Sequence, residues 1–86
     1  MTREKIAEIV DQIVADVFNL DPAYVAAHPE LNYRTDFGAT SLHYFPLLSD
    51  LEEQLNVEVE NHYFQNRAST VGETIEFMDE LVNGQK

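Results

Sequence analysis

Cysteine is absent from this chain of 86 residues. This absence excludes a disulfide framework, a thiolate metal site and a cysteine nucleophile, so any thiol chemistry must use a thiol from another molecule. Basic residues are also scarce, because 5 Lys and Arg stand against 16 Asp and Glu and give a net charge of −11. That charge argues against binding to nucleic acid or to an anionic membrane surface, and it favours partners with basic surfaces.

Long apolar runs are missing as well. No segment approaches the roughly 20 apolar residues that cross a bilayer, and the mixed charged and apolar residues at the start of the chain do not form a signal peptide. We therefore expect a cytoplasmic protein without membrane insertion. The length predicts a single domain over residues 1–86, and a hydrophobic content of 44% is sufficient for one modest core.

The spacing of apolar residues predicts an all-α fold. Stripes that recur every three to four residues indicate three main helices, over residues 1–20, 40–55 and 70–83. A short helix is expected near residues 61–65, and Asp21-Pro22 predicts a single helical turn within the long connection of residues 20–38. The predicted architecture is thus a four-helix bundle of three main helices and one short helix, with the long loop between the first and second. The expected core stripes are Ile6, Ile9, Val10, Ile13 and Val17; Tyr44, Leu47, Leu48, Leu51 and Leu55; and Val71, Ile75, Met78, Leu81 and Val82.

Polar residues at the expected helix ends indicate where each helix begins. Thr2 precedes the first helix as an N-cap, and Asn61 is predicted to cap the short helix. Thr70 and Glu73 stand three residues apart, which is the spacing of a capping box at the start of the last helix. Pro46 falls inside the second helix, so the sequence predicts either a kink there or a later start of the regular helix.

The segment Asp36-Phe37-Gly38-Ala39-Thr40-Ser41-Leu42 carries the most information about function. Its glycine allows a sharp turn, after which Thr40 and Ser41 open a helix, so the Ser41 hydroxyl is expected to be exposed at a helix N-terminus. Unpaired N–H groups and the positive end of the helix dipole favour an anion there, and a phosphate esterified to Ser41 would be well placed. Taken alone, these residues favour a plain N-cap, which is the usual role of Ser or Thr at a helix start.

Four motifs in order resemble the acyl carrier protein family, whose modification site reads Asp-Leu-Gly-Ala/Gly-x-Ser-Leu. The likeness covers nearly the whole chain. The matching segments are residues 36–42, then Leu47, Leu51-Glu52-Glu53 and Leu55, then Val57-Glu58-Val59 with Glu60 in place of the family's proline, and finally Thr70-Val71-Gly72-Glu73.

The resemblance implies a carrier, not an enzyme. Ser41 would be the attachment point of 4′-phosphopantetheine, transferred from coenzyme A by a phosphopantetheinyl transferase, with Asp36, Gly38 and Thr40 around it as cofactor-binding residues. The thiol of that group would hold an acyl or aminoacyl cargo as a thioester, which fits a chain without cysteine. The protein would be a monomeric phosphoprotein that serves fatty-acid, polyketide or another specialised biosynthesis.

The resemblance also implies a docking surface for loading, condensing and transferring enzymes with basic patches. We expect this surface on the second helix, beside Ser41, where charge sets the rate and orientation of docking more than the affinity. Its predicted residues are Leu42, His43, Phe45, Ser49, Glu52 and Glu53. Tyr44 is assigned to the core and Phe45 to the edge of an acyl pocket. The candidates for the pocket lining are Leu47, Leu51, Phe64, Ile75 and Met78.

Three residues depart from the family's pattern. Many members have an acid directly before the serine, another two positions after it, and a further glutamate on the same helix. This chain has Thr40, His43 and Pro46 at those positions, which thins the negative charge near Ser41. We therefore expect a different set of partners from those of fatty-acid-synthesis carriers.

Other classes of function have weaker support. Ser41 and His43 are two residues apart and do not face each other on a helix, and the Gly-x-Ser-x-Gly motif of hydrolases is absent, so no catalytic residue is expected. His28, His43 and His62 lack the spacing of paired metal ligands, so no metal site is expected. The alternative that stays open is an unmodified, acidic helical module that binds a basic protein. Only the carrier requires Ser41.

Overall fold

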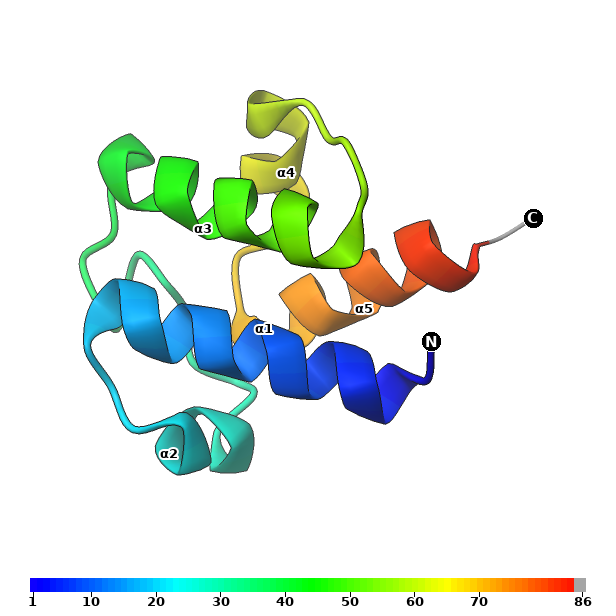
Figure 1. Ribbon diagram of the computed structural model, residues 1–86. Helices are drawn as coiled ribbons and strands as arrows, with labels where there is room; N and C mark the ends of the chain where they lie inside the picture. The colour runs from blue at the N-terminus through cyan, green and yellow to red at the C-terminus, as the bar shows by residue number, and fades with distance from the viewer. Residues whose placement is uncertain (85–86) are drawn as a thin grey trace.

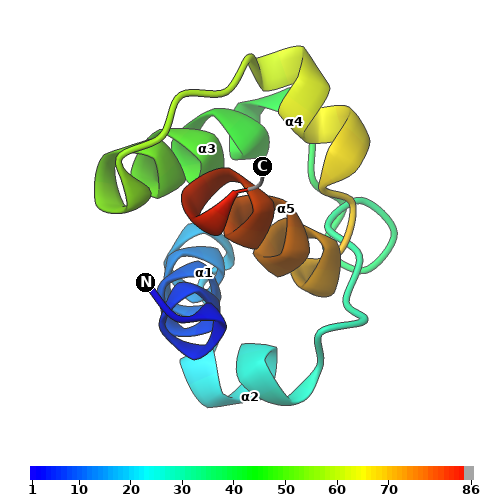
Figure 2. The same cartoon turned by 90° about the vertical axis from the view of Figure 1, so that its right-hand side faces the viewer.

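The computed structural model describes residues 1–84, and the regular structure in this range is helical. Its helices are α1 (Arg3–Phe18), α2 (Pro22–Ala27), α3 (Ser41–Leu55), α4 (Asn61–Arg67) and α5 (Val71–Asn83). α1, α3 and α5 form the centre of the bundle, and α2 and α4 lie at opposite ends of this group (Figures 1 and 2). The all-α prediction is confirmed, and the turn predicted after Asp21 is α2.

Local hydrogen bonds determine where two of the main helices begin. The Thr2 hydroxyl accepts the N–H of Lys5 at 3.1 Å and caps α1. The Thr70 hydroxyl accepts the N–H of Glu73 at 3.1 Å, and the Glu73 carboxylate accepts the N–H of Thr70 at 3.1 Å. Both predicted N-caps are confirmed, because each depends only on residues that are three positions apart.

The prediction that Asn61 caps the short helix is wrong. Glu60 is the N-cap of α4, and its carboxylate accepts the N–H groups of His62 at 3.2 Å and Tyr63 at 2.9 Å. A carboxylate at this position serves two unpaired N–H groups and also lies at the positive end of the helix dipole. Asn61 is instead the first residue of the helix.

α3 runs as one helix from Ser41 to Leu55, although Pro46 lies inside it. Thr40 is the N-cap and Ser41 is the first helical residue, so the predicted later start is not observed. Because Pro46 has no N–H group, the carbonyl of Leu42 lacks its usual donor four residues ahead. The missing bond lies on the first turn, next to an exposed side chain of Leu42.

The core lies where α1, α3 and α5 meet. Every residue of the predicted α3 stripe is buried, as are Ile6, Val10 and Ile13 of α1, whereas Ile9 and Val17 are half-buried at its edge. α1 packs against α2, α3 and α5, so its buried residues face more than one neighbour. The helical spacing thus predicted the core of α3 fully and that of α1 in part, because Val14 and Ala15 are also buried and were not in the predicted stripe.

The prediction for α5 needs a correction. Leu81 was expected in the core and is 38% exposed, while Phe77 and Thr74 are buried. The cause is that α5 packs against α1 on one side and α4 on another, and a single stripe does not describe two contact faces. Phe77 belongs to the α4 side, where its ring lies 5.6 Å from that of Tyr63.

The long connection before α3 is fastened to the start of α5. Tyr33 is fully buried, and its N–H donates to the carbonyl of Ser69 at 3.0 Å. The Tyr33 hydroxyl lies 2.6 Å from the Thr74 hydroxyl, and burial raises the pKa of Tyr33. Leu31 and Phe37 are half-buried against the core, so the prediction that these three residues anchor the loop is confirmed.

Candidate functional site

The site is the segment that leads into α3, and its loop is held in shape by its own side chains. The Asp36 carboxylate accepts the N–H of Asn32 at 2.7 Å, and the Asn32 side chain accepts the N–H groups of Arg34 at 2.9 Å and Thr35 at 3.0 Å. Asp36 was predicted as a cofactor-binding residue. In the structure its carboxylate closes the loop turn, and the side chain lies at the surface.

Gly38 turns the chain from this loop into the helix. Its φ is +65°, in the left-handed region that glycine adopts without strain. A Cβ at this position would meet nothing within 4 Å, so the requirement for glycine comes from the backbone and not from crowding. The N–H of Gly38 donates to the carbonyl of Arg34 at 3.0 Å, and the N–H of Ala39 donates to the carbonyl of Tyr33 at 2.9 Å. The buried Tyr33 thereby fixes where α3 begins.

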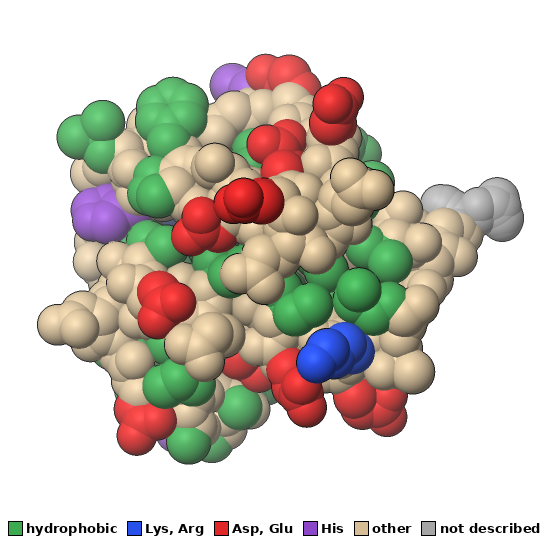
Figure 3. Space-filling model, in the orientation of Figure 1, with side chains coloured by type: hydrophobic (Ala, Val, Ile, Leu, Met, Phe, Trp, Pro, Cys, Tyr) green, Lys and Arg blue, Asp and Glu red, His purple; other side chains and the backbone are tan. Residues whose placement is uncertain are grey.

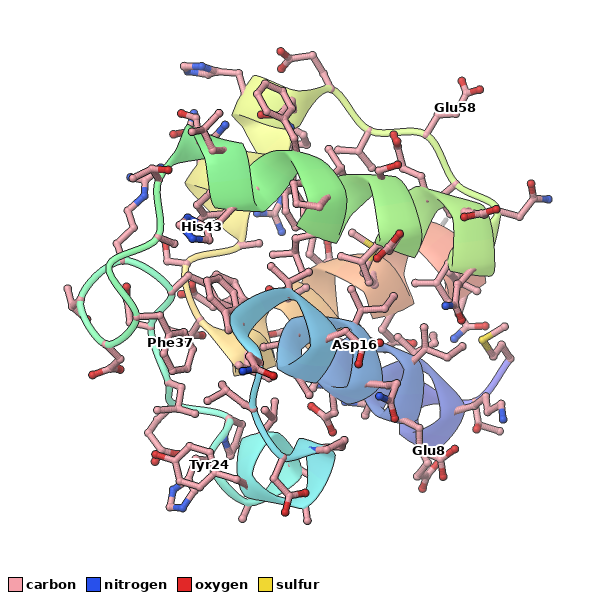
Figure 4. The ribbon with its side chains drawn as sticks, turned by 60° about the vertical axis from the view of Figure 1, so that its left-hand side comes forward. Glu8, Asp16, Tyr24, Phe37, His43 and Glu58 are labelled. Atoms are coloured by element: carbon pink, nitrogen blue, oxygen red, sulfur yellow. The ribbon has the colours of Figure 1, made fainter. Side chains whose placement is uncertain are left out.

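Thr40 and His43 form a capping box at the start of α3. The Thr40 hydroxyl accepts the N–H of Leu42 at 3.2 Å, and the His43 Nδ1 accepts the N–H of Thr40 at 3.0 Å. Only an unprotonated Nδ1 accepts a hydrogen bond, so this contact requires the neutral ring with its proton on Nε2. The His43 ring also stacks on Phe18, with 5.4 Å between the ring centroids. It lies on the side of α3 that faces the loop carrying Phe37 (Figure 4).

This geometry changes the interpretation of His43. The sequence predicted a surface residue at the partner rim, but the ring is half-buried and holds the helix start. Its Nδ1 is directed at the backbone of Thr40, not at Ser41. The structure therefore does not form a Ser–His pair of the kind that activates a nucleophile.

Ser41 is the first residue of α3, and its side chain is exposed. Among residues 1–84, its hydroxyl has no hydrogen-bond partner. The N–H groups of the first turn and the helix dipole favour a negatively charged group at this position. The arrangement offers an accessible oxygen for covalent attachment, with no base of its own to activate it.

Apart from His43, which holds the helix start, the expected docking residues lie along one side of α3 with one further exception. Leu42 is 77% exposed and Phe45 is 56% exposed, and Ser49 and Glu53 are exposed as well. Hydrophobic side chains protrude from the surface where α3 begins, at the upper left of Figure 3, and carboxylates are spread over the rest of this face. Glu52 is the exception.

Glu52 is half-buried and belongs partly to the scaffold. Its Oε2 accepts the N–H of Val59 at 2.9 Å, which fastens the connection between α3 and α4 onto α3. A partner that binds Glu52 would therefore contact a carboxylate whose Oε2 already accepts the Val59 N–H. The sequence did not reveal the contact, because the two residues are seven positions apart across a loop.

The predicted acyl pocket is only partly supported. Phe45 borders a depression of about 250 Å³ between α3 and the segment that leads into α4. Its lining is Phe45, Leu48, Ser49, Glu52, Val59 and Asn61. The lining candidates named from the sequence are buried in the core, as ordinary core packing also predicts, and those residues are Leu47, Leu51, Phe64, Ile75 and Met78.

Arg34 lies in the loop that leads into α3, and sequence reasoning did not single it out. Its guanidinium lies 5.3 Å from the centroid of the Tyr44 ring, and its Nη2 donates to the side-chain oxygen of Gln65 at 3.2 Å. Burial raises the pKa of Tyr44, and the charge of Arg34 opposes that rise. The available signal was its place, two residues before Asp36, as one of very few basic residues in the chain.

The remaining histidines lie apart from this site. His28 pairs with Glu30 at 3.0 Å, and His62 is exposed on α4. Within residues 1–84, no three His, Asp or Glu side chains come together as a group that could hold a metal ion. In the same part of the chain, no helix has the length and apolar character needed to span a membrane.

The site is thus a small helical bundle with an exposed serine, Ser41, at the start of α3. No family model matches the chain. An acyl carrier protein of Thermosynechococcus vestitus (strain NIES-2133 / IAM M-273 / BP-1) is 33% identical over 82 residues, which are 95% of this chain and 98% of that protein. An acyl carrier protein of Exiguobacterium sp. (strain ATCC BAA-1283 / AT1b) is 29% identical over 79 residues, covering 92% of this chain and 96% of that protein. The chain therefore belongs to the acyl carrier protein family.

Proposed function

We propose that this protein is an acyl carrier whose Ser41 hydroxyl carries 4′-phosphopantetheine, with an acyl or aminoacyl cargo. The observation that carries the proposal is the exposed, unpartnered Ser41 hydroxyl at the first position of α3. The segment around it has the family's motif, and the curated relatives are acyl carrier proteins. When bound, the group supplies the thiol that this chain lacks and holds the cargo as a thioester.

The residues around Ser41 fit this group. The hydroxyl is free to react. The N–H groups of Leu42 and His43 bond to Thr40, so a phosphate on the Ser41 oxygen would be favoured by the positive end of the helix dipole. Gly38, Thr40 and Asp36 act on the backbone: they turn the chain, cap the helix and close the loop. Their contribution is to hold Ser41 in one place at the surface, where a transferase reaches it.

The attachment step needs a separate enzyme. A bond forms between Ser41 Oγ and phosphorus as the phosphoanhydride of coenzyme A breaks. The nucleotide half of coenzyme A leaves, and the serine proton is lost. Because His43 is committed to the Thr40 backbone, the base must come from the phosphopantetheinyl transferase.

The same face of α3 is suited to enzymes with basic patches. Leu42 and Phe45 offer apolar contacts, and Glu53 offers a charge on the same helix. Rim charges of this kind raise association rates and set orientation. Thr40 and His43 replace acidic residues of other family members, so the negative charge near Ser41 is lower than in those proteins. This favours partners that bind the apolar side chains over partners that require a dense acidic patch. A monomeric state and a cytoplasmic location stay predictions.

Intact-mass spectrometry tests the proposal. The protein is incubated with coenzyme A, magnesium and a broad-specificity transferase, beside Ser41→Ala and the control Ser69→Ala. A carrier gains one phosphopantetheinyl group in the wild type and in Ser69→Ala, and none in Ser41→Ala. No gain in a folded wild type contradicts the proposal and favours the unmodified interaction module.

A further inference from the structure

Basic side chains are rare in this protein, and nearly all of those described are paired with acids. The pairs are Arg3–Asp79 at 3.2 Å, Lys5–Glu8 at 3.7 Å and Arg67–Glu80 at 3.3 Å. Within residues 1–84, Arg34 is the one Lys or Arg without a carboxylate in ion-pair distance.

Neutral groups hold this cation in position. The Arg34 guanidinium lies over the Tyr44 ring and donates one hydrogen bond to Gln65. The Gln65 side-chain nitrogen donates to Asn61, which leaves its oxygen directed at Arg34. A guanidinium has five N–H donors, so several stay available while the group lies over the aromatic ring. The arrangement leaves a cation without a carboxylate partner from the described residues.

Its place in the fold links it to Ser41. The Arg34 carbonyl accepts the N–H of Gly38, on the turn that leads into α3. Tyr44 follows Ser41 by three residues, and residues three apart are neighbours on a helix surface. Arg34 thus contacts the turn into α3 through its backbone, and its guanidinium contacts Tyr44, whose backbone lies less than one helical turn, about 5 Å along the axis, from that of Ser41.

We propose that Arg34 is an anion-binding residue of the site built around Ser41. Its ligand is an anionic oxygen of the attached group, either the phosphodiester of the arm or a carboxylate on the cargo. Both present paired oxygens that match the guanidinium fork. This inference rests on the proposed function, and it adds a recognition role that the motif around Ser41 does not contain.

The test compares Arg34→Gln and Arg34→Lys with Arg3→Gln. Arg3→Gln removes the same charge near the N-terminus, at the far end of the bundle from the start of α3 (Figure 1). Each variant is checked by circular dichroism and then converted to its loaded form, with loading verified by intact mass. Phosphorus NMR then reports on the phosphodiester. A second arm loads butyryl and succinyl groups from their coenzyme A thioesters and measures the thermal midpoint of each form.

The proposal expects an Arg34-dependent signal in one of the two arms. A phosphorus chemical shift that moves in Arg34→Gln, recovers partly in Arg34→Lys and stays fixed in Arg3→Gln assigns the phosphodiester. A higher midpoint for the succinyl than for the butyryl form, lost in Arg34→Gln alone, assigns a cargo carboxylate. Complete loading with neither effect overturns the role of Arg34 and leaves the carrier function intact. Failure of the wild type to load overturns both.

Discussion

Asp11 gives the sharpest prediction about the scaffold. It lies on the buried side of α1 and is 9% exposed, and its Oδ1 is buried without a hydrogen-bond partner among the described residues. Burial raises the pKa of this carboxyl above its ordinary value of 3.8. The folded protein therefore holds this carboxyl in a place that favours its neutral form over its ionised form. We predict that Asp11→Asn, which keeps the shape and removes the charge, stabilises the protein.

The magnitude follows from the charge. A buried polar group without a partner costs about 1–3 kcal/mol, and more when it is charged. Asp11→Asn keeps a polar atom at the buried position and removes only the charge, so we take the gain at the low end, about 1 kcal/mol. For a domain of this size, that corresponds to a rise in the thermal midpoint of about 4–8 °C. Linkage gives the sign: the folded state binds the Asp11 proton more tightly than the unfolded state, so the wild type loses stability as pH rises from 3.8 through the raised pKa.

The assay is urea unfolding, followed by circular dichroism at neutral pH and at several lower values. Asp16→Asn is the matched control, because it removes the same charge from the exposed side of α1 (Figure 4). We expect the advantage of Asp11→Asn to exceed that of Asp16→Asn at neutral pH and to shrink as pH falls toward 3.8. Equal effects of the two variants, or an advantage of Asp11→Asn that does not change with pH, would refute the reasoning.

Three further predictions concern the segments around the site. Tyr33→Phe removes the contact with Thr74 and should lower the unfolding free energy by about 1 kcal/mol in urea titrations. In a Thr74→Val background, where that contact is already absent, the same substitution should not cause this loss. Gly38→Ala forces a side chain into the left-handed region and should cost about 1–2 kcal/mol, measured as a lower thermal midpoint, with Gly38→Asn in between. Glu52→Ala should free the Val59 backbone and speed its amide hydrogen exchange, while Glu52→Gln keeps the acceptor and the slow rate.

Sequence periodicity predicted the parts of the fold that depend on neighbouring residues. The buried stripe of α3 and the caps at Thr2 and Thr70 follow from spacings of three or four positions. The cap of α4 was assigned one residue too late, because Glu60 and Asn61 are adjacent and both residue types bond to helix N–H groups. Residue preference alone does not decide which of the two is the N-cap. The backbone conformation of the preceding loop decides it.

Long-range packing accounts for the features that sequence reasoning missed. Phe77 is buried and Leu81 is exposed because α4 covers one side of α5, and that contact joins segments from different parts of the chain. His43 was expected at the rim, since a capping box normally has Glu or Gln at that position. Its stacking on Phe18 brings α1 and α3 together and is not visible in either helix alone.

The site also combines features that depend on neighbouring residues with features that depend on long-range packing. The place of Ser41 at a helix start follows from residues 36–42, and the structure puts it there. Arg34 was missed because its partners, Tyr44 and Gln65, are 10 and 31 residues away. A basic residue that lies outside a motif is recognised as part of a site only when the fold brings it there.

The central claim is that Ser41 carries the prosthetic group, and peptide-level mass spectrometry tests it most directly. After reaction with coenzyme A and a transferase, trypsin cleavage at Arg34 and Arg67 releases a single peptide that contains Ser41. Fragmentation of that peptide locates the added group. The account predicts one phosphopantetheinyl group on Ser41, with no modified peptide from Ser41→Ala. A group on any other residue, or an unmodified peptide from a folded protein, would contradict it.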